Sequence, residues 1–233
     1  MKWFRNLVVV VSLLLGSCIP ANASDSTDAV AKAIDSTVSI QLYLDDSWRT
    51  VGSGVTVRKH GALYFGKEPS FGILTAQHVA EVRSFALPIR ACAAANQRSC
   101  VQLNDYIVDS EIGYSNDWAI FLVDKLPKDT KPALIRRGTD PRLGEDIVQV
   151  GYPWGNFFVA KGVLGAYMGD AEGYYFACHG FAAAGSSGGG VWDQYGRLIG
   201  LTIAREIREN VLTGLPEMQE DYVFVTPIRR TGL

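Results

Sequence analysis

Short apolar runs, each ended by Gly, Asp, Asn or Pro, recur along most of the 233 residues and constrain the fold more than any other feature. Residues 38–44 have Val, Ile or Leu at every second position, the pattern of a strand with one buried face. Many short strands separated by turn residues predict an all-β sandwich or barrels. The 24 glycines agree, because glycine adopts the positive φ angles of tight turns. The other predicted strands are Val55–Val57, Leu63–Phe65, Gly72–Thr75, Tyr106–Val108, Trp118–Val123, Asp146–Val150, Phe157–Val159, Tyr174–Ala177, Gly190–Trp192, Leu198–Ile203 and Tyr222–Thr226.

Two segments depart from this pattern. Asp25–Ile34 is rich in alanine, a strong helix former, so a short helix is expected there. The segment 127–142 is polar and contains three prolines. We interpret it as a linker between two β units, residues 24–126 and 143–233, which together make one domain.

The N-terminus has the order of a secretory signal. Lys2 and Arg5 precede the apolar segment Leu7–Leu15, and the small residues of Ala21-Asn22-Ala23 follow. The apolar segment is shorter than the roughly 20 residues that a membrane-spanning helix needs. We therefore expect residues 1–23 to be removed from an exported protein, periplasmic or secreted, with no membrane span.

The cysteines fit an oxidising compartment. Cys92 and Cys100 flank a short polar segment, so we expect a disulfide that closes this local loop. Cys178 lies in an apolar stretch and is expected to be a buried free thiol. Cys18 ends a Leu-Leu-Gly-Ser-Cys sequence that resembles a lipoprotein cleavage box. A lipid anchor at Cys18 is therefore the alternative to cleavage after Ala23.

Three local sequences carry residues suited to nucleophilic catalysis. His78 lies in Leu-Thr-Ala-Gln-His-Val, Asp117 in Asn-Asp-Trp-Ala-Ile, and Ser187 in Gly-Ser-Ser-Gly-Gly-Gly. A serine hydroxyl needs a base within hydrogen-bond reach, and imidazole takes and returns a proton near neutral pH. A carboxylate then fixes the imidazole tautomer. The backbone N–H groups of Gly185 and Ser187 are the expected oxyanion hole.

Each of these residues also has an ordinary structural interpretation when taken alone. His78 could be a core or surface histidine, Asp117 a loop end, and Ser187 part of a flexible turn. Their joint occurrence in the order His, Asp, Ser favours catalysis. His60 is expected at the surface of a turn, and His179 is expected to be structural, with lining of the substrate cleft as the alternative.

Other classes of site fit less well. The glycine-rich segment also matches the Gly-x-Ser-x-Gly elbow of α/β-hydrolases, but that fold requires a histidine after the serine, and all three histidines precede Ser187. The segment lacks the Gly-Lys-Ser/Thr ending of a phosphate loop. The histidines lack metal-ligand spacing, so no metal or other cofactor is expected. The net charge of −2, without a basic run, argues against a nucleic-acid partner.

These motifs resemble the trypsin-like serine protease superfamily, and most closely its bacterial Deg, or high-temperature-requirement, type. The likeness extends over residues 36–230. Gly52-Ser53-Gly54-Val55 is similar to the early Gly-Ser-Gly hairpin of that family, and Gly144–Pro153 is similar to its strand entering the second barrel.

The resemblance implies two six-stranded antiparallel β-barrels of the chymotrypsin-like kind, with the active site in the cleft between them. It places His78 and Asp117 on the first barrel and Ser187 on the second. Ser186 stands where zymogen-activated relatives carry Asp, which implies that activation by N-terminal insertion does not operate. We expect no peptide-binding domain after Leu233, and thus a stand-alone protease domain.

The resemblance also implies where substrate specificity arises. Phe181 occupies the position of the pocket base, and Thr202, Ile203 and Ala204 are expected to form the opposite wall. These residues include no carboxylate to pair with a substrate Lys or Arg, so a small or medium apolar side chain is the expected preference. Arg205 lies nearby and offers the alternative of a preference for acidic residues.

The sequence therefore predicts a serine endopeptidase that acts on protein or peptide substrates through an acyl-enzyme. The alternative is a catalytically silent binding module with a trypsin-like fold. An esterase on another fold is a third possibility.

Overall fold

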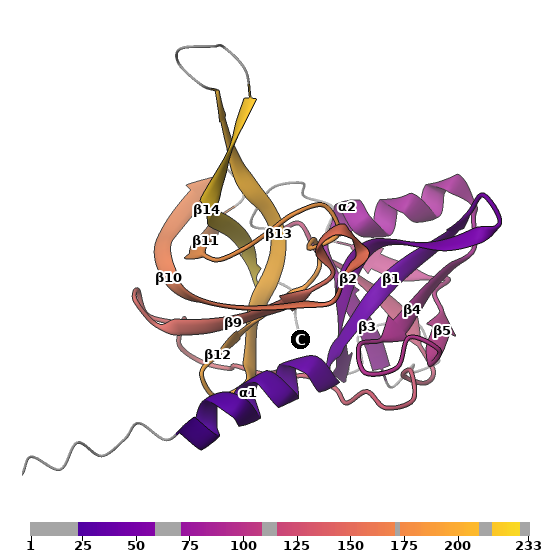
Figure 1. Ribbon diagram of the computed structural model, residues 1–233, viewed down its shortest axis with the longest axis horizontal. Coiled ribbons are helices and arrows are strands. Elements are labelled where there is room, and N and C mark those ends of the chain that lie inside the picture. The colour runs from indigo at the N-terminus through magenta and orange to yellow at the C-terminus, as the bar shows by residue number, and fades with distance from the viewer. Residues whose placement is uncertain (1–22, 59–70, 109–115, 171–172, 210–215, 229–233) are drawn as a thin grey trace, which may run out of the picture.

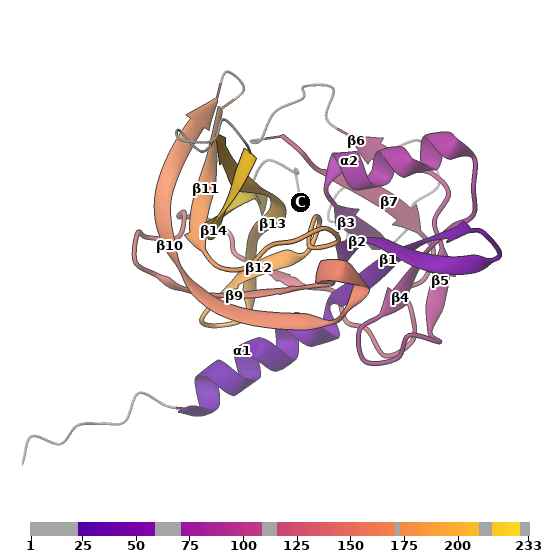
Figure 2. The ribbon, with the colours of Figure 1, turned by 45° about the horizontal axis from the view of Figure 1, so that its top comes forward.

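The structure is a computed structural model that describes residues 23–58, 71–108, 116–170, 173–209 and 216–228. Strands dominate it and form two seven-stranded sheets that lie side by side (Figure 1 and Figure 2). The all-β, chymotrypsin-like two-barrel prediction is confirmed. Within the described parts of the chain, no helix is both long and apolar enough to cross a membrane.

The first sheet has the order β5-β4-β1-β2-β3-β7-β6, and every neighbouring pair is antiparallel. It differs in detail from the six strands expected, because it has seven, and none of the pairings between described residues joins the end strands β5 and β6. Its strands are β1 (Thr37–Leu44), β2 (Ser47–Arg58), β3 (Phe71–Thr75), β4 (Ile89–Ala93), β5 (Cys100–Gln102), β6 (Tyr106–Val108) and β7 (Ala119–Val123).

The second sheet closes into a six-stranded antiparallel barrel, because β12 pairs with both β9 and β13. A seventh strand, β8, adds to β13 in parallel and lies inside the segment 127–142 that was interpreted as linker. That segment is therefore not free of strand structure, and a strand of two residues is too short to show a period in the sequence. The strands are β8 (Leu134–Ile135), β9 (Asp146–Gly151), β10 (Phe158–Asp170), β11 (Gly173–His179), β12 (Gly190–Asp193), β13 (Arg197–Glu209) and β14 (Pro216–Pro227).

The alternating strand at residues 38–44 is present as β1, but the expectation of one buried face is wrong. Its polar residues Ser39 and Gln41 are buried as well. Both bond to Gln97, since Ser39 Oγ donates to Gln97 Oε1 (2.8 Å) and Gln41 Nε2 donates to the same oxygen (3.0 Å). The hydrogen bonds offset the cost of burying these polar groups.

The expected N-terminal helix is confirmed as α1 (Ala23–Asp35). Ala29 and Ala33 are buried where α1 contacts β9, β12 and β13 of the second barrel. The helix then leads directly into β1 of the first barrel, and Thr37 Oγ1 donates to the Ala33 carbonyl (2.7 Å). Figure 1 shows α1 lying along the second barrel and ending beside the first sheet. It therefore connects the two sheets.

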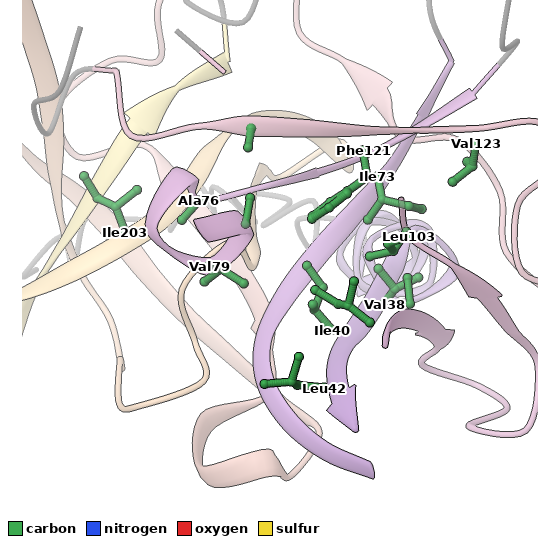
Figure 3. Close-up of a cluster of buried hydrophobic side chains, with 14 of the residues drawn as sticks. Val38, Ile40, Leu42, Ile73, Ala76, Val79, Leu103, Phe121, Val123 and Ile203 are labelled. Carbon is green, nitrogen blue, oxygen red and sulfur yellow. The ribbon is translucent and has the colours of Figure 1, made fainter. Parts of the chain in front are cut away.

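Buried side chains inside the first sheet hold the short helix α2 (Gln77–Ala80), which follows β3. Val79 of α2 belongs to this cluster together with Ile73 and Phe121, and Ile203 of the second barrel joins it at the border (Figure 3). A second cluster lies between the two sheets. It consists of Ala33, Val55, Val57, Leu74, Trp118, Val148, Val150, Trp192, Leu198, Leu201 and Ile228.

The cysteine predictions are confirmed. Cys92 of β4 and Cys100 of β5 form a disulfide, and the two residues are direct cross-strand partners. Cys178 is a buried free thiol, and burial raises its pKa to about 12. A thiol with that pKa has almost no reactive thiolate at neutral pH. The lipoprotein alternative at Cys18 and the signal at residues 1–23 concern a part of the chain that lies outside the described residues, apart from Ala23.

Replacing both Cys92 and Cys100 by Ala should lower the free energy of unfolding by about 2–3 kcal/mol, the chain-entropy effect of so short a loop. Urea unfolding followed by tryptophan fluorescence measures the change, in oxidised wild type and in the double variant. Dithiothreitol should shift the wild-type midpoint and leave that of the variant unchanged. Equal midpoints for oxidised wild type and variant would contradict a stabilising bridge.

Candidate active site

Pairing between two strands of the first sheet brings His78 and Asp117 together. Thr75 at the end of β3 pairs with Ala119 at the start of β7, so α2 after β3 faces the turn before β7. His78 Nδ1 lies 2.7 Å from Asp117 Oδ2, and the His78 backbone N–H donates to Asp117 Oδ1 (3.1 Å). Two contacts with one carboxylate fix both the position of the imidazole and the nitrogen it offers elsewhere, which is Nε2.

The surroundings of His78 make it a stronger base than an ordinary histidine. Its side chain is 47% exposed and that of Asp117 is 19% exposed, so the pair is partly screened from water. Burial alone would lower the pKa of His78. The hydrogen bond to Asp117, the charge of that carboxylate and the charge of Glu81 together outweigh burial and raise the pKa above its ordinary value of 6.5.

Ser187 lies in the loop between β11 and β12 of the second barrel, and this loop contacts the chain just before His78. The Ser53 N–H of β2 donates to the Ser187 carbonyl (2.8 Å), and the Gly188 N–H donates to the Thr202 carbonyl (2.7 Å). Gly188 has φ +81°, and a Cβ atom there would collide with Thr75 and Ser53. The loop therefore lies directly against the segment that precedes His78, and only glycine fits at the contact.

The Ser187 hydroxyl itself donates to the Ile203 carbonyl (3.3 Å). It makes no hydrogen bond to His78 within the described parts of the chain. Catalytic hydrogen bonds are often long or misaligned before substrate binds, so this arrangement is compatible with a resting enzyme.

The loop around Ser187 leaves two backbone donors free. Among the described residues, the N–H groups of Gly185 and Ser187 donate no hydrogen bond. Gly185 has φ +94°, a conformation that side chains rarely adopt. The buried Ser186 holds the loop from within, because its hydroxyl accepts the Ala183 N–H (3.1 Å) and its own N–H donates to the Ala183 carbonyl (2.9 Å).

The predicted substrate-binding residues are only partly brought together. The Phe181 ring makes tilted contacts with two aromatic rings, that of Trp154 (centroids 5.3 Å apart) and that of Phe158 at the start of β10 (5.0 Å). Thr202 and Ile203 are buried on β13 next to the Ser187 loop. Ala204 also belongs to β13, but its side chain lies outside the described parts, as does that of Arg205.

Sequence reasoning missed Gln149, a buried amide of β9. Its Nε2 donates to Thr202 Oγ1 (2.8 Å), and its Oε1 accepts the Phe181 N–H (3.2 Å). Gln149 therefore bridges the two predicted sides of the pocket and adds an amide to an otherwise apolar set. The one available signal was a polar residue inside the apolar run of β9.

Of the two remaining histidines, only His179 belongs to the described parts of the chain. His60 is outside the described residues, and His179 ends β11 opposite Val163 with an exposed side chain. A cavity of about 200 Å³ opens at residues 135–141 and is also lined by Ile199, Pro227 and Ile228. None of the predicted site residues lines that cavity, so it is separate from the chemistry.

Solved structures similar to this chain are proteases. AlgW, an HtrA-type protease bound to a tripeptide, is 18% identical with a TM-score of 0.60, over 88% of this chain and 60% of its own. The serine endoprotease from Yersinia pestis is 18% identical with a TM-score of 0.62, over 89% of this chain and 64% of its own. The chain thus spans less than two thirds of these proteins.

Rv3671c from M. tuberculosis H37Rv, in an inactive form with a serine-to-alanine substitution, is 18% identical with a TM-score of 0.57, and 91% of each chain is covered. No curated protein matches the chain. The trypsin-like peptidase domain matches residues 52–201, which is more than half of the sequence and includes His78, Asp117 and Ser187. The chain belongs to the trypsin-like peptidase family.

Proposed function

We propose that this protein is a serine endopeptidase that hydrolyses peptide bonds in protein or peptide substrates. The observation that carries the proposal is the double contact of His78 with Asp117, beside a loop that presents Ser187 and two free backbone donors. Family membership supports the same class of activity. AlgW is similar in fold and has been solved with a tripeptide, which agrees with peptide substrates.

In the proposed reaction, Ser187 Oγ attacks the scissile carbonyl while His78 Nε2 takes the proton of the Ser187 hydroxyl. The Asp117 carboxylate stabilises the resulting imidazolium through Nδ1. The proton then passes from His78 to the leaving amine, which departs and leaves an acyl group on Ser187. Water, activated by the same imidazole, releases the second product and restores the serine.

Charge that develops on the substrate oxygen needs donors that are already in place. The N–H groups of Gly185 and Ser187 donate to no other described residue and so are available for this role, and losing one such donor typically costs about 10²–10³ in rate. Before attack, the Ser187 hydroxyl must leave the Ile203 carbonyl and turn toward His78. When substrate binds, the Ser187 hydroxyl can donate to His78, and a peptide N–H of the substrate can donate to the Ile203 carbonyl. Each group then has a hydrogen-bond partner again.

Specificity is proposed to arise from Phe181, Thr202, Ile203 and Ala204, with preference for a small or medium apolar side chain before the scissile bond. Gln149 adds an amide between Phe181 and Thr202. Arg205 supports the alternative, which is a preference for acidic residues in the substrate. A peptide-library profile dominated by Lys or Arg would contradict both.

The second candidate is a catalytically silent trypsin-fold binding module. The hydrogen bond of Ser187 to Ile203 rather than to His78 favours it.

We also propose that the protein is exported, with removal of residues 1–23 or lipidation of Cys18. The mature domain would consist of units 24–126 and 143–233, joined by the linker 127–142.

The first test is labelling of the purified protein with a fluorophosphonate–rhodamine probe, with the modified peptide identified by mass spectrometry. Adduct is expected on Ser187 because only an activated serine reacts. It should be absent in Ser187→Ala and slowed about 10⁴-fold or more in His78→Ala. Circular dichroism verifies folding, and urea-unfolded wild type is the control for nonspecific reaction.

Cleavage of fluorescein-labelled casein then separates the two candidates. An endopeptidase releases fluorescent peptides from casein, and Ser187→Ala does not. A folded wild type that neither reacts with the probe nor cleaves casein would favour the binding module.

The pH dependence of labelling should report the raised pKa of His78. His78 acts as a base only when neutral, so the rate should fall as pH drops through that pKa, with the midpoint above 6.5. Asp117→Asn removes the charge that raises the pKa. Its midpoint should move to lower pH, and its maximal rate should fall about 10⁴-fold.

NMR titration of the His78 ring gives the same pKa without any reaction. Glu81→Gln serves as the matched control, because the charge of Glu81 is the smallest of the three effects that raise the pKa of His78, the other two being the hydrogen bond and the charge of Asp117. It should shift the midpoint downward slightly and leave the maximal rate unchanged. A wild-type midpoint below 6.5 in both measurements would refute this assignment.

A further inference from the structure

Ser53 is the point at which the first barrel holds the nucleophile loop of the second. It lies on β2 and is completely buried. Its hydroxyl donates to the Gly185 carbonyl (2.7 Å) and accepts the Tyr152 N–H (2.8 Å). Its backbone N–H donates to the Ser187 carbonyl (2.8 Å). One residue therefore bonds to both members of the proposed oxyanion hole.

The hydrogen bond from the Ser53 hydroxyl to the Gly185 carbonyl restricts rotation of the backbone at Gly185. Glycine has no side chain to limit its backbone, so a neighbour must select its conformation. Fixing the Gly185 carbonyl fixes the peptide plane that follows Gly185. The bond to the Ser187 carbonyl fixes the plane after Ser187. The Ser187 N–H lies between these two planes, and the Gly185 N–H lies one residue before the first.

Ser53 is itself held rigidly. Its carbonyl accepts the hydroxyl of Thr75 (2.7 Å), three residues before His78. On its other side, a Cβ atom on Gly151 would lie 3.0 Å from Ser53 Oγ, so the hydroxyl is closely packed. Ser53 can therefore hold the nucleophile loop in a fixed position relative to the chain segment before His78.

Tyr152, the second partner of the hydroxyl, is fixed at both ends. Its N–H donates to Ser53, and its phenolic oxygen accepts a hydrogen bond from Gln97 Nε2 (2.7 Å). Its carbonyl lies where a Cβ atom of residue 185 would collide, so only glycine fits beside it. Gln97 belongs to the loop closed by the Cys92–Cys100 disulfide. The Ser53 hydroxyl thus accepts from a fixed donor, the Tyr152 N–H, and donates to the Gly185 carbonyl.

We propose that the Ser53 hydroxyl is a positioning group that sets the oxyanion-hole donors through the Gly185 carbonyl. This inference rests on the proposed endopeptidase function. Ser53 touches no substrate in the proposed reaction and acts through Gly185. Its loss should therefore slow the chemical step and leave binding of the substrate largely unchanged.

The test is Ser53→Ala, assayed with the fluorophosphonate–rhodamine probe at several concentrations to separate kinact from KI. We expect kinact to fall about 10- to 100-fold, less than or comparable to the loss of a whole oxyanion donor. KI should stay within about twofold, because uniform binding is not altered. Thr56→Val is the matched control. It removes another buried hydroxyl of β2, one that donates to the Lys131 carbonyl (2.6 Å) and not to the nucleophile loop.

Thr56→Val should lower the unfolding midpoint without changing kinact, whereas Ser53→Ala should change both. If Ser53→Ala does not fold, Ser53→Cys replaces it, since a thiol is a weaker donor of similar size. A folded Ser53→Cys should have a kinact below that of wild type. Wild-type kinact in a folded Ser53 variant, or an equal loss in Thr56→Val, would overturn the inference. An unreactive wild type would instead overturn the proposed function.

Discussion

The packing of the two barrels against each other is the constraint on which the site depends. Trp192 of the second barrel is completely buried between the sheets, together with Val55 and Leu74 of the first. The cluster positions β2 and β3 relative to β12, and the chain continues from β3 to His78 and from Ser187 into β12. Removing a buried tryptophan typically costs about 3–5 kcal/mol. Loss of this packing would separate His78 from Ser187.

Hydrogen bonds then refine a contact that apolar packing makes only approximately. The Thr75 hydroxyl, the Ser53 backbone and the Ser187 carbonyl form a continuous series across the barrel interface. Thr75 and Ser53 are completely buried, and a buried polar atom without a hydrogen-bond partner is costly. This cost makes displacement of the Ser187 loop unfavourable, so the same bonds that stabilise the interface also define the geometry of the loop.

The sequence was most informative where structure is local. The period-two pattern, the alanine-rich helix and the short cysteine loop each depend on neighbouring residues, and all three are present as α1, β1 and the Cys92–Cys100 bridge. The strands β4, β5 and β8 were not predicted. Ala and Cys in β4 make a weak apolar signal, and β8 is held by pairing with a distant strand. The predicted strand Leu63–Phe65 lies outside the described residues.

Long strands were also underestimated, because a strand can continue through residues with no clear period. The run Phe157–Val159 corresponds to the start of β10, which extends to Asp170. Its register with β9 and β11 is set by two partners on opposite sides. Pairing of that kind overrides weak local preferences.

By itself, the sequence determined the residue types of the site, since His78, Asp117 and Ser187 each stand in a short recognisable context. Only the tertiary structure decided which of their side chains are in contact. The His78–Asp117 contact spans 39 residues of sequence, and the Ser53–Gly185 contact spans 132. The tertiary structure also determines that the Ser187 hydroxyl donates to the Ile203 carbonyl and that the Gln149 amide lies between Phe181 and Thr202. Side-chain chemistry can be read locally, but hydrogen-bond partners depend on which strands the closed barrel and its neighbour bring together.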